Sequence, residues 1–370
     1  MALLITGATG HLGPHLIAEL LRAGDFDRLY VAARRNGGSS AARVNALERA
    51  AASLEAASTA SMRTTLVPVD ADLPAGGLAV PFDDITAIVH AAADTRFAAP
   101  LEVLRRSNVE GTRAVCDLAA RCPHLQQLLF VSTACVAGRR TGVIREEMQD
   151  DSAGFANAYE QTKWEAERLV AASGLPARIA RLTTCAGSHA TGYVHRFGAL
   201  HHLLHWMARG LVPMVPGTVA TPIDVISTDV AAAWLARAVT RKPGGLEICH
   251  VALGERAIPL GELLDLVFPL LAGDRGAPVQ RPILVDEDVF ESFTRMVRLS
   301  GDALLARVQD AAASVLPSLL HPKQYETQAA ERCWGGPLPH ADWRTLFSQV
   351  IAYARAQRWG FVAAAEVCHA

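Results

Sequence analysis

The sequence lacks the long apolar runs that would place it in a membrane. No stretch reaches the roughly 18 uninterrupted apolar residues that a spanning helix needs, and the richest one, Leu260 to Leu271, contains two acidic residues and a proline. The first residues, Met1 to Ile5, also lack the basic region and the cleavage site of a signal peptide. We therefore expect a cytoplasmic protein with no membrane span.

Cysteine is scarce and has no regular spacing. The 370 residues include seven cysteines, an odd number, and no CxxC pair. Disulfide-rich domains and structural zinc sites need regular cysteine spacings, so we expect reduced thiols. His201 and His205 lie four apart, but no acidic residue or further cluster of ligands accompanies them. No metal site is predicted.

Neither sign of charge is in excess. Lys and Arg number 35 against 37 Asp and Glu, which gives a formal net charge of -2. A chain this balanced creates no overall field that would attract nucleic acid or an anionic membrane, so no nucleic-acid partner is expected. Hydrophobic residues make up 51% of the sequence, which is enough to fill the core of one large α/β domain and a smaller second one.

The first two thirds of the chain alternate short apolar runs with longer amphipathic segments. This pattern is typical of a parallel sheet with helices on both faces. The expected strands are Leu3–Thr6, Leu29–Ala33, Thr65–Val69, Ala87–His90, Leu128–Ser132 and Arg178–Leu182. The expected helices are His11–Ala23, Ala41–Ala57, Leu101–Arg121 and Asn157–Ala172. The sequence therefore predicts an α/β fold built on a doubly wound parallel-sheet Rossmann domain.

The alternation is less regular in the rest of the chain. A helix is expected around Phe197–Arg209, and a strand at Pro222–Ile226 and a helix at Thr228–Thr240 then resume the pattern. Past Pro259 we expect a mostly helical chain. The predicted Rossmann domain comprises residues 1–187 and 218–258, and the predicted smaller substrate-binding or lid domain comprises residues 188–217 and 259–370.

A glycine-rich segment follows the first expected strand and opens the first expected helix. It reads Thr6-Gly7-Ala8-Thr9-Gly10-His11-Leu12-Gly13. In this position, backbone amides at the start of the helix can face a pyrophosphate. Gly7 permits the tight turn, Gly10 the close approach of the phosphates, and Gly13 the close packing of the helix. The predicted contacts of a dinucleotide are Gly7, Thr9, Gly10, His11, Leu12 and Gly13.

Two arginines, Arg34 and Arg35, follow the second expected strand. NAD-specific sites usually place an acidic residue there, where it binds the ribose 2′-hydroxyl. A guanidinium group instead matches a 2′-phosphate through paired hydrogen bonds. We therefore predict NADPH as the cofactor, with Arg34 as the first choice for the phosphate contact and Arg35 as the second.

Thr133, Tyr159 and Lys163 form the predicted catalytic group. Tyr159 and Lys163 are four apart on an expected helix and so share one face of it beside the cofactor, while Thr133 ends an expected strand. A free tyrosine has a pKa of about 10, and a neighbouring ammonium group together with a nicotinamide cation stabilises the phenolate. Thr133 would bind a substrate carbonyl oxygen, Tyr159 would protonate it, and Lys163 would tune Tyr159.

Together these motifs resemble the extended short-chain dehydrogenase/reductase family, over roughly Leu3 to Val251. The further matching segments are His90-Ala91-Ala92-Ala93 and Asn108-Val109-Glu110-Gly111-Thr112. The resemblance implies an NADP-binding Rossmann domain in which Ala91, Ala92 and Ala93 lie at the cofactor and Asn108 supports the active-site helix. It also implies that Asp72 and Leu73 meet the adenine, with Asp70 as the competing choice.

Three segments are similar to one particular branch of that family. They are Val131–Gly138, Gly142–Glu146 and Ala158–Glu167, and they resemble thioester reductases and fatty acyl-CoA reductases. Members of this branch use NADPH to reduce an acyl thioester to an aldehyde, and sometimes onward to an alcohol. The resemblance implies this activity and a substrate carried on coenzyme A or on an acyl carrier protein. We expect a monomer or a homodimer.

Three other functions stay open at this point. The same catalytic residues suit an oxidoreductase of ketones or secondary alcohols, such as steroid-like or polyketide-like substrates. A scaffold that binds NADPH without turnover has the same fold, although the presence of Thr133, Tyr159 and Lys163 argues against it. An epimerase or dehydratase of nucleotide sugars usually holds NAD tightly and rarely has arginine after the second strand.

Overall fold

The chain forms two compact units in a computed structural model that describes residues 1–34, 39–54, 64–75, 77–78, 80–97, 99–272, 279–312, 315–340 and 342–360. The first unit comprises Met1–Thr183, Thr228–Glu255 and Tyr325–Pro339, and the second comprises Thr184–Ser227, Arg256–Gln324 and His340–Ala370. The predicted domain boundaries differ from these units chiefly at 218–227, which lie in the second unit, and at 325–339, which lie in the first.

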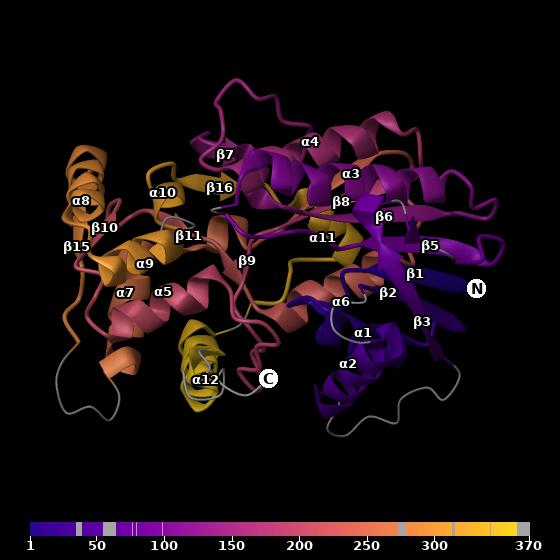
Figure 1. Ribbon diagram of the computed structural model, residues 1–370, viewed down its shortest axis with the longest axis horizontal. Coiled ribbons are helices and arrows are strands. Elements are labelled where there is room, and N and C mark those ends of the chain that lie inside the picture. The colour runs from indigo at the N-terminus through magenta and orange to yellow at the C-terminus, as the bar shows by residue number, and fades with distance from the viewer. Residues whose placement is uncertain are drawn as a thin grey trace. The chain divides into compact units, whose positions relative to one another are not determined.

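An eight-stranded sheet forms the centre of the first unit, in the order β13-β8-β6-β5-β1-β2-β3-β4. Its strands are β1 (Ala2–Thr6), β2 (Arg28–Ala33), β3 (Thr65–Asp72), β4 (Gly77–Leu78), β5 (Ile85–His90), β6 (Gln127–Thr133), β8 (Ala177–Leu182) and β13 (Glu247–Val251). Neighbouring strands are parallel except β3 and β4. Because the order runs outward from β1 in both directions, the predicted doubly wound Rossmann fold is confirmed (Figure 1).

Helices cover both faces of this sheet (Figure 1). On one face α1 packs beside α2 and α6, and on the other α3 packs beside α4. The bounds are α1 (Gly13–Ala23), α2 (Ser40–Leu54), α3 (Leu101–Ala119), α4 (Ala158–Ala172) and α6 (Thr228–Ala238), with the shorter elements η1 (Leu73–Ala75), η2 (Ala134–Ala137), β7 (Gly142–Ile144) and η3 (Gly254–Arg256). Among the described residues, the predicted helices of this region therefore lie where the sequence places them, to within a few residues. Residues 55–57 of the expected helix Ala41–Ala57 lie outside the described residues.

The expected strand Pro222–Ile226 is not part of the large sheet. It is two short strands of the second unit, β11 (Pro222–Ile223) and β12 (Val225–Ile226). β11 pairs antiparallel with β14 (Ile258–Pro259), whereas β12 pairs parallel with β9 (Thr184–Cys185). The apolar pattern is correct, but the chain changes its pairing partner in the middle of the run, which a sequence pattern does not reveal.

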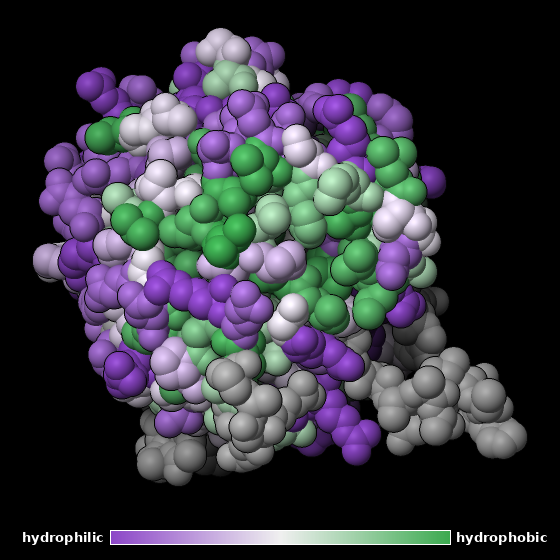
Figure 2. Space-filling view, turned by 90° about the vertical axis from the view of Figure 1, so that its left-hand side faces the viewer, coloured by the Kyte–Doolittle hydropathy of each residue, from purple (hydrophilic) through white to green (hydrophobic). Residues whose placement is uncertain are grey.

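The second unit is mostly helical, with its own apolar core between α5, α7 and α12. Its helices are α5 (Ala199–Ala208), α7 (Leu260–Ala272), α8 (Glu287–Ser300), α9 (Ala303–Ala312), α10 (Leu316–Leu319), α12 (Trp343–Ala356) and η5 (Arg358–Gly360), and its further strands are β10 (Met214–Pro216) and β15 (Ile283–Val285); β16 (Lys323–Tyr325) lies at the boundary of the units. α8 and β15 leave Met296, Leu299 and Ile283 exposed. Figure 2 shows apolar side chains gathered on the face that it turns toward the viewer.

Among the described residues, the structure has no helix long and apolar enough to cross a bilayer.

The segment Tyr325–Pro339 belongs to the first unit because α11 (Gln328–Trp334) packs on β13 and α6. Trp234 of α6 is fully buried, and its indole nitrogen donates a hydrogen bond to the backbone oxygen of Ala330 at 3.0 Å. The C-terminal third of the sequence thus returns to cover the outer strand of the large sheet.

A single carboxylate fixes the start of α11 to this sheet edge. The carboxylate of Glu146 accepts hydrogen bonds from the backbone nitrogens of His250 (2.8 Å) and Ala330 (3.1 Å), and also from that of Ala329. An acidic group at a helix N-terminus satisfies amides that have no partner inside the helix. Glu146 therefore joins β13 to α11.

Replacing Glu146 by alanine should destabilise the protein by about 2–4 kcal/mol, because several buried N–H groups lose a charged acceptor. Urea unfolding followed by circular dichroism measures this change. The matched control is Glu147→Ala, which removes an exposed side chain from the neighbouring position. It should change the free energy of unfolding by less than about 0.5 kcal/mol. Equal effects of the two variants would contradict the role given to Glu146.

Candidate active site

The glycine-rich turn joins β1 to α1. Gly7 has a φ of 78°, and a Cβ atom there would lie 2.4 Å from the backbone of Ala91, which follows β5. A Cβ atom on Gly13 would lie 1.4 Å from the backbone oxygen of Ala8. Both positions therefore require glycine. The residue before α1 is Leu12, whose side chain cannot accept a hydrogen bond, so no side chain caps the start of the helix, where the helix dipole favours a phosphate. The second helical residue, Pro14, has no amide hydrogen to donate.

Neighbouring helices hold the other predicted residues of this turn. The Nε2 atom of His11 lies 3.0 Å from the hydroxyl oxygen of Thr228, the first residue of α6. The hydroxyl oxygen of Thr9 accepts a hydrogen bond from Arg43 of α2 at 3.3 Å. Within the turn, the backbone nitrogen of Gly10 donates to the backbone oxygen of Gly7 at 2.9 Å. α2 and α6 thus fix the shape of the turn.

The arginines after β2 are only partly described. Arg34 is exposed, and Arg35 lies outside the described residues. A further arginine, Arg43 in the first turn of α2, donates from Nη1 to the backbone oxygen of Arg34 at 2.9 Å, as well as from Nη2 to Thr9. The sequence does not single out Arg43, because only the folded sheet brings the first turn of α2 to the end of β2 and to the glycine-rich turn.

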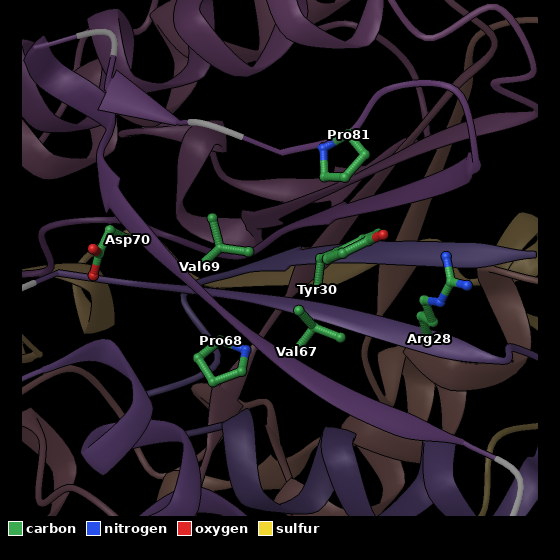
Figure 3. A pocket seen from close by; sticks show the side chains of 7 residues that line it. All are labelled: Arg28, Tyr30, Val67, Pro68, Val69, Asp70 and Pro81. Atoms are coloured by element: carbon green, nitrogen blue, oxygen red, sulfur yellow. The ribbon is translucent and has the colours of Figure 1, made fainter.

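The residues expected at the adenine lie at the carboxyl end of β3. Asp72 is exposed and ends the strand, and the buried Leu73 begins η1. Asp70, the competing choice, lies at one end of a pocket over β2 and β3, and Arg28 lies at the other end (Figure 3). The pocket is also lined by Tyr30, Val67, Pro68, Val69 and Pro81. Both acidic residues thus lie at or near the carboxyl end of β3, and the glycine-rich turn follows the carboxyl end of the parallel strand β1.

α4 places Tyr159 and Lys163 beside the end of β6, the strand that Thr133 terminates. Asn157 caps this helix, since its side-chain oxygen accepts from the backbone nitrogen of Glu160 at 3.0 Å. The Nζ atom of Lys163 donates to the backbone oxygen of Val131 at 2.9 Å, two residues before Thr133. The structure therefore brings the strand end and the helix of the predicted catalytic group together.

The ammonium group of Lys163 is almost fully buried. It lies 4.0 Å from the centre of the Phe130 ring, in a cation–π arrangement. Burial lowers the pKa of Lys163 to about 7, and the nearby charge of Glu167 partly opposes this shift. The amine therefore gains or loses its proton near neutral pH, and a charged group that binds beside it would shift the pKa of Lys163.

Tyr159 and Thr133 are fixed by different contacts. The Tyr159 ring packs edge-on against the ring of Phe97, with 5.0 Å between the ring centres. The hydroxyl oxygen of Thr133 accepts from the backbone nitrogen of Cys135 at 3.2 Å. Because this bond uses an acceptor lone pair of Thr133, the hydroxyl hydrogen can still be donated to a ligand.

Asn108 of α3 connects the loop after β5 to α4. Its side-chain oxygen accepts from the backbone nitrogen of Asp94 at 2.7 Å, and its Nδ2 atom donates to the backbone oxygen of the same residue and to the hydroxyl of Thr162, each at 3.0 Å. The loop begins with Ala91, Ala92 and Ala93, the residues expected at the cofactor. Asn108 therefore joins this loop to α4, the helix that carries Tyr159.

His201 of α5 forms hydrogen bonds to the backbone. The Nε2 atom of His201 lies 2.8 Å from the backbone oxygen of Ala186, and its Nδ1 atom accepts from the backbone nitrogen of Gly198 at 3.1 Å. In the part of the chain that the structure describes, no cluster of His, Cys, Asp and Glu side chains is arranged to hold a metal ion.

Comparison with known proteins identifies a family and several similar chains. Residues 5–235 match the family model described as "Male sterility protein". An isonitrile lipopeptide synthase of Streptomyces coeruleorubidus is 35% identical over 237 residues. That match covers 60% of this chain but 16% of the synthase, so the chain corresponds to a small part of that relative.

Two solved structures share the fold. The terminal R domain of the myxalamid PKS-NRPS biosynthetic pathway has a TM-score of 0.75 and 24% identity, and the match covers 98% of this chain and 92% of that one. A thiolation-reductase di-domain of an archaeal non-ribosomal peptide synthetase has a TM-score of 0.67 and 17% identity, with 97% of this chain and 76% of that one covered.

The family match spans both the glycine-rich turn and the Tyr159–Lys163 helix, and it confirms the family resemblance predicted from the motifs. This chain belongs to the male sterility protein family, within the thioester reductase and fatty acyl-CoA reductase branch of the extended short-chain dehydrogenases/reductases.

Proposed function

We propose that this chain is an NADPH-dependent reductase that converts an acyl thioester, carried on coenzyme A or on a carrier protein, to the aldehyde or alcohol. The observation that carries the proposal is the attachment of the Tyr159–Lys163 helix to the strand end that bears Thr133, in a chain of this family. The similarity to a lipopeptide synthase and to a thiolation-reductase di-domain supports a thioester on a carrier protein.

The first unit fits a nicotinamide dinucleotide. Gly7 leaves no room for a side chain beside Ala91, and no side chain caps the start of α1, where the helix dipole favours a pyrophosphate. When bound, the nicotinamide would supply a hydride to the carbonyl carbon of the substrate. The residues predicted from the sequence to contact the cofactor remain the proposed contacts. Arg43 is added to them as a contact of the 2′-phosphate.

The chain's own residues would stabilise the charge that develops on the substrate oxygen. Thr133 can donate its hydroxyl hydrogen to that oxygen, and Tyr159 can donate the proton that balances the added hydride. The resulting hemithioacetal loses its thiol, which leaves the aldehyde. The overall step consumes one reduced cofactor and one proton, and it releases one oxidised cofactor and one thiol.

Arg43 and Arg34 together favour the phosphorylated cofactor. Arg43 reaches both the end of β2 and the glycine-rich turn, the two segments between which an adenosine 2′-phosphate would lie. A guanidinium group held in this position offers donors to phosphate oxygens without a large loss of side-chain entropy. Arg34 follows the end of β2 and is exposed, so no surrounding side chains prevent it from moving toward a phosphate.

Thioester reduction should release free thiol in step with NADPH oxidation. An acyl-CoA panel, followed at 340 nm and with a thiol reagent, measures both. Tyr159→Phe should lower kcat by about 100-fold or more, because the proton donor is lost. Tyr30→Phe is the matched control: Tyr30 lies on β2, its hydroxyl donates to Asp84, and removal of that hydroxyl should leave kcat unchanged. Ketone turnover without thiol release would instead favour the carbonyl oxidoreductase alternative.

Arg43→Ala should raise the KM for NADPH by about tenfold or more, because a charged hydrogen-bond donor to the phosphate is lost. The KM for NADH should change little, since that cofactor has no 2′-phosphate. Steady-state kinetics with both cofactors provides the measurement. Arg49→Ala, at an exposed position of the same helix, is the control and should affect neither KM. A parallel loss for both cofactors would argue against a phosphate contact.

The burial of Lys163 predicts a pH dependence of stability in the cofactor-free protein. Its pKa is about 7 in the folded chain but about 10.4 in an unfolded one. Between these values unfolding takes up a proton, so stability rises with pH by up to about 1.4 kcal/mol per pH unit. Urea unfolding at pH 7 to 9 should show this rise relative to Lys163→Met. A difference between the two proteins that stays constant with pH would contradict the buried, neutralisable amine.

A further inference from the structure

His90 ends β5 and is almost completely buried, although it carries no role in the chemistry described above. Its two ring nitrogens both lie at hydrogen-bonding distance from threonine hydroxyls. The Nδ1 atom is 2.7 Å from Oγ1 of Thr6, the last residue before the glycine-rich turn, and Nε2 is 3.0 Å from Oγ1 of Thr112 on α3. The ring therefore spans the space between the cofactor turn and the helix that carries Asn108.

The direction of these bonds follows from their neighbours. The hydroxyl of Thr112 donates its hydrogen to the backbone oxygen of Asn108 at 2.6 Å, so toward His90 it can only accept. Nε2 must then carry the hydrogen. On the other side, Oγ1 of Thr6 lies 3.4 Å from the backbone nitrogen of Ala92, from which it accepts, and its own hydrogen points to Nδ1. One neutral tautomer of His90 satisfies every partner.

The His90 ring is neutral near pH 7. Burial and the nearby charge of Lys163 lower the pKa of His90 to about 3. Phe130 of β6 lies next to both side chains, 5.6 Å from the His90 ring centre and 4.0 Å from the ammonium of Lys163. The ring therefore stays neutral near pH 7, with its hydrogen on Nε2.

The hydrogen-bonded chain continues from His90 to the catalytic helix. Asn108, reached through Thr112, donates to the hydroxyl of Thr162, which in turn donates to the backbone oxygen of Tyr159 at 3.0 Å. Thr6, Thr112, Asn108 and Thr162 are all buried. Buried polar chains in which every group is satisfied are rigid, because breaking any one bond leaves groups without partners.

We propose that His90 is a positioning residue for hydride transfer: its ring fixes the distance between the glycine-rich turn and, through Thr112 and Asn108, the helix that carries Tyr159. This inference rests on the proposed function, since it assigns His90 to the geometry of that reaction. His90 touches neither substrate nor cofactor in this role. It acts by holding Thr6, which precedes the glycine-rich turn, at a fixed distance from α3, which Asn108 in turn joins to α4.

The test compares substitutions that remove or keep the two hydrogen bonds. His90→Leu leaves the Thr6 hydroxyl without its acceptor and the Thr112 hydroxyl without its donor. His90→Gln keeps one acceptor and one donor, at a separation similar to that of the two ring nitrogens. We expect His90→Leu to lower kcat by about tenfold or more and to weaken NADPH binding, because small displacements of reacting groups cost large factors in rate. His90→Gln should recover most of both losses.

Gln127→Leu controls for general destabilisation. Gln127 is as buried as His90, lies at the start of β6 and donates to the backbone oxygen of Ala238 at 3.1 Å, far along the strand from Thr133. It should lower the thermal midpoint without changing kcat or NADPH affinity. Loss of activity in Gln127→Leu equal to that in His90→Leu, at similar thermal midpoints, would overturn the proposal, and so would full activity and affinity in His90→Leu.

NADPH binding, measured by fluorescence titration, separates this inference from the proposed function. If the wild type oxidises no NADPH with any thioester, the proposed function fails. In that case the NADPH binding constants of the variants by themselves test whether His90 is a positioning residue. Weak binding in His90→Leu that His90→Gln restores supports the role, whereas equal binding in all variants contradicts it.

Discussion

A buried ammonium group attaches the active-site helix to the sheet. Lys163 donates to a backbone oxygen of β6 and lies over the face of the Phe130 ring, so a charge that burial opposes is stabilised by a peptide dipole and a π-system. The accepting oxygen belongs to Val131, in the strand that Thr133 ends. The position of Tyr159 relative to Thr133 depends on this contact, and the remaining hydrogen bonds around the site refine it.

The sequence predicts the central sheet well because its inner strands are continuous apolar runs. It fails at the outer strand β13, which reads Glu-Ile-Cys-His-Val. Its His250 is buried because a ring nitrogen lies 3.3 Å from the guanidinium of Arg181, which in turn forms a fully buried ion pair with Glu167. Polar residues inside a core look like surface residues until their partners are known, and these partners are far apart in the sequence.

The same distinction divides the site. The glycine-rich turn and the Tyr-x-x-x-Lys helix are recognisable because local spacing alone fixes their geometry. Arg43 and the Thr6–His90–Thr112 chain are not, since each joins segments that come together only through the folded sheet. The sequence thus identifies the groups proposed to do the chemistry, and the structure adds the groups that hold them in place.

The return of Tyr325–Pro339 to the first unit has a consequence for how this enzyme family can be recombined. Neither unit is a continuous piece of chain, because the backbone passes repeatedly from one to the other. A hybrid made at a single junction near residue 258 would take α11 from a different parent than β13, the strand on which it packs. Exchange of the second unit between relatives would therefore preserve folding only if the segment Tyr325–Pro339 came from the same parent as the Rossmann sheet.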